Sequence, residues 1–153
     1  ELAERFRLYR LLARMAEGVG GISASDCEAE IRRVLADAHE RLDASLFCYN
    51  FGVMLASGVP IKLALSTAAE ALDAASAAKV QEIADTCDTF EPFNETLAGR
   101  LEEVPGLPGV AMELFRVGLE TGLLDIMSQR ASDLLRLEVD REILSAMARC
   151  LQA

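Results

Sequence analysis

The stretch FCYNFGVMLASGVPIKLALSTAAEAL, residues 47–72, decides how the chain folds. It holds two apolar segments separated by Ser57-Gly58-Val59-Pro60. Glycine suits the end of a helix, and proline suits the first turn of the next one. After the break, apolar residues recur at helical spacing at Ile61, Ala64, Leu65, Ala68, Ala69 and Leu72. The stretch therefore predicts two helices joined by a tight turn, the first of them deeply buried through Phe47, Phe51, Met54 and Leu55.

The first of these segments belongs to a run without charge from Ala44 to Ile61. A run of about 18 apolar residues is long enough to suggest a membrane span. Gly58 and Pro60 lie near its end, and Asn50 and Ser57 make it more polar. The two-sided helix that follows indicates a helical core in water instead, so we interpret the run as a buried helix.

The composition favours an all-α protein. The chain has 153 residues, of which 52% are hydrophobic, 26% are charged and only 5% are aromatic. β-Branched residues do not alternate with polar ones over any useful length, whereas helix-forming Ala and Leu are plentiful. The formal net charge of −10 argues against nucleic acid and anionic membrane surfaces as ligands, because both require clusters of Lys and Arg.

Along the chain we expect an all-α helical bundle of about six to eight helices, packed as antiparallel helix–turn–helix units. Ser25 and Glu28 predict a capping box for a helix that runs to about Arg41, with His39 near its end. The second half of the last helix is expected to project from the core. The remaining helices are predicted at residues 2–17, 77–88, from Pro92, 108–121 and 123–151, with a soft joint at 74–78 and a loop at 104–109.

No pattern in the sequence predicts a catalytic, cofactor or metal site. The cysteines, at positions 27, 48, 87 and 150, form no CxxC pair, and His39 is the only histidine. A zinc site needs about four ligands at short paired spacing. We interpret the cysteines as small, mostly buried residues of a protein in a reducing compartment, and Cys87 as a surface thiol. The glycines at 18, 20 and 21 lack the strand and the Lys-Ser/Thr of a phosphate loop.

Two segments together resemble a known family. Leu55-Ala56-Ser57-Gly58-Val59-Pro60-Ile61, continuing to Ala64-Leu65, resembles an L-x-SGVPL-x-x-AL motif. Val117 to Asp125, VGLETGLLD, resembles VGE-x-x-G-x-L-D. In this order and about 60 residues apart, they are similar to the type II secretion system F-domain family. Its members are inner-membrane platform proteins of type II secretion systems and type IV pili. The chain departs from the motif at Leu119, where members usually carry Glu, and its acid follows at Glu120.

The resemblance implies a non-enzymatic cytoplasmic helical domain of a multi-pass protein, on the cytoplasmic face of the bacterial inner membrane. Its implied partners are the assembly ATPase, bitopic inner-membrane proteins and pilin-like subunits, with self-association through the Met/Leu-rich stripe of the last helix. It also implies structural roles at corners and close approaches for the motif residues Ser57, Gly58, Pro60, Gly118, Glu120, Gly122, Leu124 and Asp125.

We expect one domain over residues 1–153. It would comprise an extra N-terminal helical pair at 1–45, a family-like core at 46–138, and a helix at 139–153 that leads to a membrane span in the parent chain. Two other functions stay open from the residues alone. One is a free-standing soluble helical adaptor, and the other is a helical enzyme or metal-binding bundle with inward-facing carboxylates.

Overall fold

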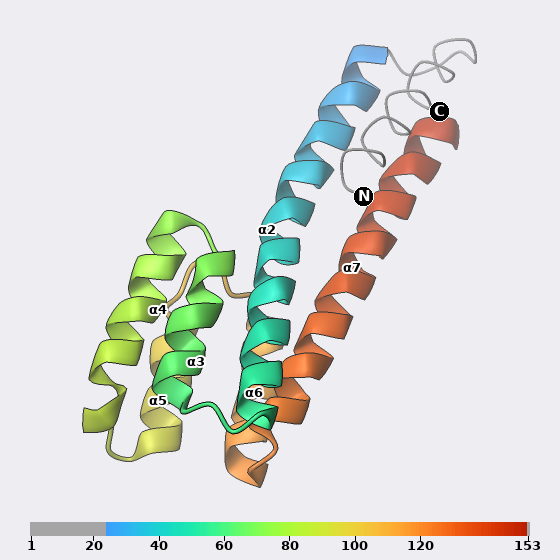
Figure 1. Ribbon diagram of the computed structural model, residues 1–153. Coiled ribbons are helices and arrows are strands. Elements are labelled where there is room, and N and C mark those ends of the chain that lie inside the picture. Colours follow the sequence, from blue (N-terminus) through green and yellow to red (C-terminus); the bar gives the residue numbers. More distant parts are fainter. Residues whose placement is uncertain (1–23, 153) are drawn as a thin grey trace. The chain divides into compact units, whose positions relative to one another are not determined.

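The computed structural model describes residues 24–152, and its regular structure in that range is entirely helical (Figure 1). The prediction of an all-α helical bundle is confirmed. The helix predicted at 2–17 lies outside the described residues. The elements are α2 (Ala24–Ala56), α3 (Ile61–Ala68), the 3-10 turn η1 (Ala69–Ala71), α4 (Ala74–Thr86), the 3-10 turn η2 (Cys87–Thr89), α5 (Phe93–Glu102), α6 (Gly109–Thr121) and α7 (Leu124–Gln152).

Helix α2 corrects the predicted end near Arg41. It runs without a break from Ala24 to Ala56, because residues 25–51 contain neither glycine nor proline. Ser25 consequently lies inside the helix, not at its cap, and His39 lies near its middle, away from a helix C-terminus. Among the helices of residues 24–152, none is both long and apolar enough to cross a membrane.

The chain divides into two compact units, and helices α2 and α7 contribute to both. The larger unit, Glu40–Leu137, contains α3 to α6 with the end of α2 and the start of α7. The described part of the smaller unit consists of residues 24–39 and 138–152. The predicted limits of the family-like core, 46–138, differ from those of the larger unit by six residues at one end and one at the other.

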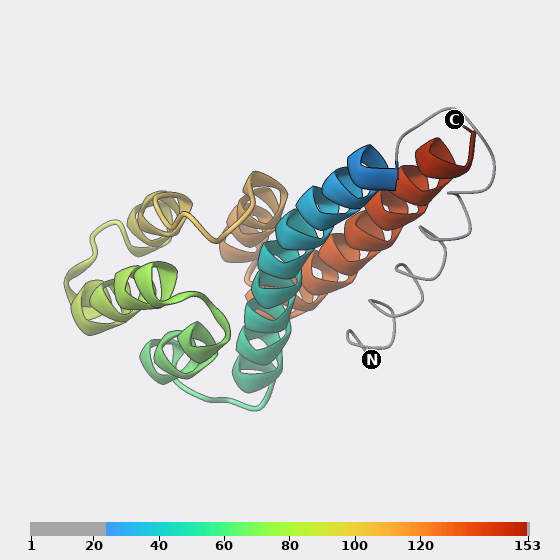
Figure 2. The ribbon, with the colours of Figure 1, turned by 90° about the horizontal axis from the view of Figure 1, so that it is seen from above.

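In the larger unit, the four short helices pack on one side of α2 and α7 (Figure 2). The rings of Phe47, Phe51 and Phe115 lie at its centre, with centroids 5.7–6.5 Å apart. The apolar stripe predicted for α3 is buried at Ala64, Leu65 and Ala68. Long apolar side chains from the other short helices complete this core, namely Val80, Ile83, Leu97, Leu101 and Met112.

The predicted joint at 74–78 is wrong, because α4 already begins at Ala74. Asp73 caps the helix, and its carboxylate accepts a hydrogen bond from the Ser76 backbone N–H at 3.2 Å. The Ser76 hydroxyl in turn accepts one from the Gly106 N–H at 2.9 Å, which fixes the predicted 104–109 loop against α4. Hydrogen bonds from the Ser76 side chain and from the Ser76 backbone lower the pKa of Asp73.

Helix α6 is also more one-sided than its apolar sequence suggests. Ala111, Met112 and Phe115 are buried, whereas the side chain of Val117 is 44% exposed. The apolar stripe predicted on the last helix likewise contains both buried and exposed side chains. Ala131, Leu135 and Ile143 are buried within their units, but Leu123 and Leu144 are exposed.

Candidate functional site

The first motif forms the corner between α2 and α3. Gly58 has a left-handed backbone, with φ of 80°, and its N–H donates to the Leu55 carbonyl at 3.0 Å. The Val59 N–H donates to the Met54 carbonyl at 3.0 Å, and this pair of bonds is the Schellman arrangement that ends a helix. Pro60 follows with φ of −56° and begins α3. The corner is therefore built by backbone geometry that glycine adopts without strain.

The second motif forms a similar corner between α6 and α7. Gly122 has φ of 76°, and the Leu123 N–H donates to the Gly118 carbonyl at 2.9 Å. In each corner a hydroxyl side chain precedes the left-handed glycine and donates to a carbonyl one turn back. Ser57 donates to Val53 at 2.9 Å, and Thr121 donates to Val117 at 2.6 Å.

Gly118 has a second role in this corner, because α6 and α7 approach closely there. A Cβ atom added to Gly118 would lie 2.7 Å from Leu124 Cα and 3.0 Å from Met127 Cβ. Such contacts are too short for any side chain, so the backbones can meet only at a glycine. Asp125 lies in the first turn of α7, where a carboxylate interacts favourably with the helix dipole.

A residue three positions before the first motif, which was not predicted as a site residue, contacts the second motif. Gly52 is buried in α2, and an added Cβ atom would lie 2.8 Å from the Asp125 carbonyl oxygen and 2.9 Å from Gln129 Cγ. The end of α2 therefore contacts the start of α7. Glycine inside a helix costs about 0.5–1 kcal/mol relative to alanine, and this was the available signal for a close approach.

Farther along the same contact, hydroxyl groups link α2 to α7. The buried Ser45 hydroxyl lies 2.9 Å from the Ser132 hydroxyl and 3.0 Å from the Ser132 carbonyl oxygen. Arg136 Nε donates to the Ser45 oxygen at 3.3 Å. Because buried polar groups need partners, these bonds fix how the two helices are aligned within the larger unit.

The positions where the chain departs from the motif have different surroundings. Leu119 packs partly buried against the core, and its carbonyl accepts a hydrogen bond from the Asn94 amide at 3.0 Å. Glu120, the displaced acid, is exposed, as are Ser57, Gly58 and Pro60.

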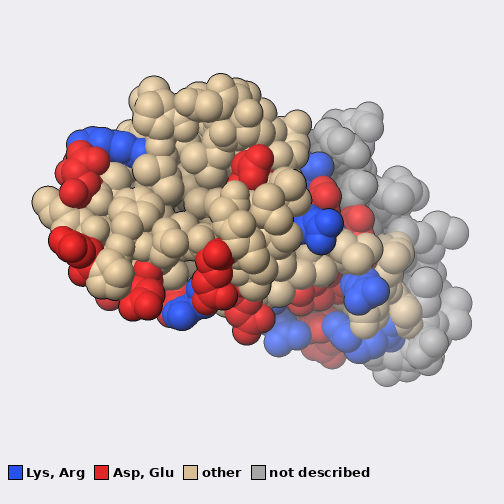
Figure 3. All heavy atoms as spheres, turned by 90° about the horizontal axis from the view of Figure 1, so that it is seen from below, with Lys and Arg blue, Asp and Glu red and all other residues tan. Residues whose placement is uncertain are grey.

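Both corners lie at the lower end of the helices in Figure 1, and Figure 3 views the molecule from that side. It shows a broad uncharged area with Asp and Glu along much of its margin.

Acidic residues are concentrated between Glu82 and Glu103, where seven Asp or Glu accompany a single Arg. Arg100 pairs with Glu82 at 2.8 Å, and Lys79 lies 3.6 Å from Glu103, so these ion pairs connect α4 to α5. Glu91 and Glu95 on the same segment are exposed. This part of the larger unit therefore exposes negative charge at the surface.

The cysteines correct two interpretations. Cys87 is buried, not a surface thiol, and burial together with nearby Asp88 raises its pKa. Burial raises the pKa of Cys48 to about 12. Cys27 and Cys150 form a disulfide, a pairing that their separation of 123 residues did not reveal. Between residues 24 and 152, no group of three or more His, Cys, Asp or Glu side chains is arranged to hold a metal ion.

Comparisons with known proteins agree with the motifs. The family model described as "Type II secretion system (T2SS), protein F" matches residues 47–151, which is more than half of the chain. The match contains both corners. No curated protein and no solved structure matches the chain.

Proposed function

Because the chain belongs to the type II secretion system protein F family, we propose that it is a scaffold domain of an inner-membrane platform protein for type IV pilus biogenesis or type II protein secretion. The family is a structural component of secretion machinery. The family match over residues 47–151 is the observation that carries the proposal. The domain would lie on the cytoplasmic face of the membrane and bind other components of the machine, without catalysing a reaction.

The proposed partners are the assembly ATPase, the bitopic inner-membrane proteins and the pilin-like subunits. For the ATPase, we propose contact with the acidic segment 82–103, because its negative charge complements a basic protein surface. Glu91 and Glu95 are exposed there, whereas Glu82 and Glu103 already pair with basic side chains within the domain.

The test is calorimetric titration of the purified chain with the purified assembly ATPase of the same machine, at low and at high salt. The double variant Glu91→Lys/Glu95→Lys should weaken binding by about tenfold or more, because it reverses charge at the proposed contact. A matched variant, Glu70→Lys/Asp133→Lys, makes the same charge change on α7 and η1 and should bind like the original chain. Absence of binding at high micromolar concentration would contradict the partner assignment.

Self-association is a second element of the proposal, and we propose it on α2 because much of the apolar stripe of α7 is buried within the domain. Leu46, Tyr49 and Val53 recur at helical spacing along α2, and each is at least 37% exposed. Exposed apolar side chains at this spacing suit a protein contact. Sedimentation should detect dimers at high concentration that Tyr49→Glu abolishes. Leu63→Glu, at an exposed apolar position on α3, is the matched control and should leave the dimer intact.

A free-standing adaptor is distinguished from a platform domain by the parent reading frame. The platform proposal requires apolar segments of about 20 residues beyond the domain and a second copy of both glycine corners. A frame that lacks both features would favour the adaptor.

A further inference from the structure

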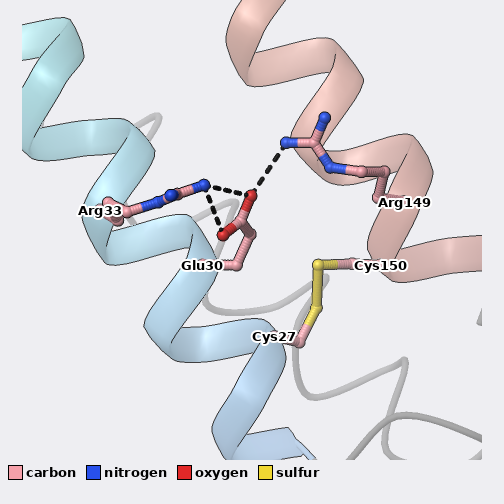
Figure 4. Close-up of a disulfide and its surroundings, with 5 residues drawn as sticks. All are labelled: Cys27, Glu30, Arg33, Arg149 and Cys150. Carbon is pink, nitrogen blue, oxygen red and sulfur yellow. Dashed lines mark hydrogen bonds and ion pairs between the residues drawn. A yellow bond between two sulfur atoms is a disulfide. The ribbon is translucent and has the colours of Figure 1, made fainter.

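The Cys27–Cys150 disulfide joins the first turn of α2 to the last turn of α7 within the smaller unit (Figure 4). The two Cα atoms are 5.8 Å apart, within the usual range for a disulfide. Cys27 is 3% exposed, and Cys150 is partly exposed. Cys27 precedes the family match, which begins at residue 47, so this cross-link does not follow from family membership.

An exposed ion pair and small apolar side chains lie beside the disulfide at this end. Glu30 pairs with Arg149 at 2.9 Å and also with Arg33 at 2.9 Å. The Arg149 side chain is 56% exposed, and exposed ion pairs stabilise a fold only weakly. The buried apolar side chains of residues 24–39 and 138–150 are mostly small, namely Val34, Ala38, Val139, Ile143 and Ala146.

We propose that Cys27 and Cys150 form a redox-controlled clamp whose thiol or disulfide state decides whether residues 24–39 and 138–152 stay paired. The co-reactant is a low-molecular-weight disulfide of the glutathione class. The Cys150 thiolate, the more accessible of the two, attacks a sulfur of oxidised glutathione, which forms a mixed disulfide and releases one glutathione thiolate. The Cys27 thiolate then attacks the Cys150 sulfur and releases the second. The protein loses two electrons and two protons, and the oxidised glutathione takes them up and becomes two reduced glutathione molecules.

The other thiols do not compete in this exchange. Cys48 and Cys87 are 0% and 1% exposed. Burial raises the pKa of both, and the thiolate is the reactive form. The exchange is therefore confined to Cys27 and Cys150.

Local opening explains why the disulfide would act on this unit. If the larger unit stays folded while the smaller one opens, the disulfide closes a flexible loop made of residues 27–39 and 138–150. Closing such a loop, about 26 residues long, reduces the entropy of the opened state enough to change the opening equilibrium on the order of 100-fold. Reduction should therefore release this unit and leave the larger one unchanged.

The experiment uses the complete 153-residue chain in glutathione buffers of stepped oxidised-to-reduced ratio. Alkylation followed by mass spectrometry gives the fraction of disulfide, and amide hydrogen exchange gives the opening of each segment. We expect one disulfide, between Cys27 and Cys150. Exchange at residues 27–39 and 138–150 should become on the order of 100-fold faster on reduction. Residues 44–135 should exchange at the same rate in both states.

Three variants separate the steps. Cys27→Ser should accumulate the mixed disulfide on Cys150, whereas Cys150→Ser should form it more slowly on the buried Cys27. The double variant should exchange like the reduced protein in every buffer. The clamp is disproved if both thiols remain alkylatable when oxidised glutathione predominates, or if exchange at both segments is the same with and without the disulfide. Neither result bears on ATPase binding, so the proposed function is tested separately.

Discussion

The two compact units of this chain hold together by different means. The larger unit, Glu40–Leu137, surrounds three phenylalanine rings in mutual contact and brings backbones together at Gly52 and Gly118. The described part of the smaller unit buries no aromatic side chain and adds a disulfide and an ion pair to a few small apolar contacts. Packing therefore specifies the first unit, whereas a cross-link supports the second. Substitutions should distinguish them by the size of their effect.

The largest effect is expected at the phenylalanine cluster. Phe115 is 1% exposed, and its ring contacts those of Phe47 and Phe51. Phe115→Ala should lower the free energy of unfolding by about 3–5 kcal/mol, because it removes buried apolar surface and leaves a cavity. Urea denaturation followed by circular dichroism measures the change.

The control comes from the smaller unit. Leu144 on α7 is 64% exposed, so Leu144→Ala should change the free energy of unfolding by no more than about 0.5 kcal/mol. If the two substitutions cost the same, the buried phenylalanine cluster contributes no more to stability than an exposed leucine, and it does not hold the larger unit together.

The next effect tests the close approach of α6 and α7. Gly118→Ala places a Cβ atom 2.7 Å from Leu124 Cα, which is backbone and cannot rotate away. Overpacking of this kind should destabilise the chain by about 1–3 kcal/mol. Gly99, inside α5, has open space around it, so Gly99→Ala should stabilise the chain by about 0.5–1 kcal/mol through helix propensity. In the same denaturation assay, the two substitutions should change the free energy of unfolding in opposite directions. Changes in the same direction would mean that the helices do not meet at Gly118.

A smaller effect is expected at the first corner, where the backbone conformation of Gly58 matters but no neighbouring atom crowds it. Nothing lies within 4 Å of an added Cβ at Gly58, but its φ is 80°. Gly58→Ala should cost about 1 kcal/mol, because left-handed backbone is unfavourable for residues with a Cβ. Gly58→Asn should recover part of that loss, since asparagine tolerates this conformation. The comparison fails if alanine and asparagine destabilise the chain equally in thermal denaturation.

Much of the larger unit could be predicted from local sequence signals. Gly58, Pro60, Pro108 and Gly122 end or begin helices at the expected positions, since such residues act through their own backbone. The helix end predicted near Arg41 was wrong. Residues 25–51 contain neither glycine nor proline, so the local sequence itself favours one continuous helix there.

The features that escaped prediction depend on contacts between α2 and α7. In the sequence Gly52 looks like any other glycine within a helix, because its close contact with Asp125 exists only in the folded structure. Cys27 and Cys150 pair because the two helices bring their far ends together, and nothing in either local sequence encodes this. The shared physical reason is that antiparallel pairing couples residues about 70–120 positions apart, whereas helix propensity and capping act over a few residues.

The smallest effect concerns the ion pair beside the disulfide. A double-mutant cycle with Glu30→Gln and Arg149→Gln isolates their coupling from the separate pair that Glu30 makes with Arg33. We expect about 0.2–1 kcal/mol in low salt and less at high salt, because Arg149 is mostly exposed and solvent ions screen such pairs. The cycle is measured by urea denaturation with the disulfide intact. A coupling above about 2 kcal/mol would mean that charge holds the smaller unit together as firmly as the cross-link, and that reduction alone would not release it.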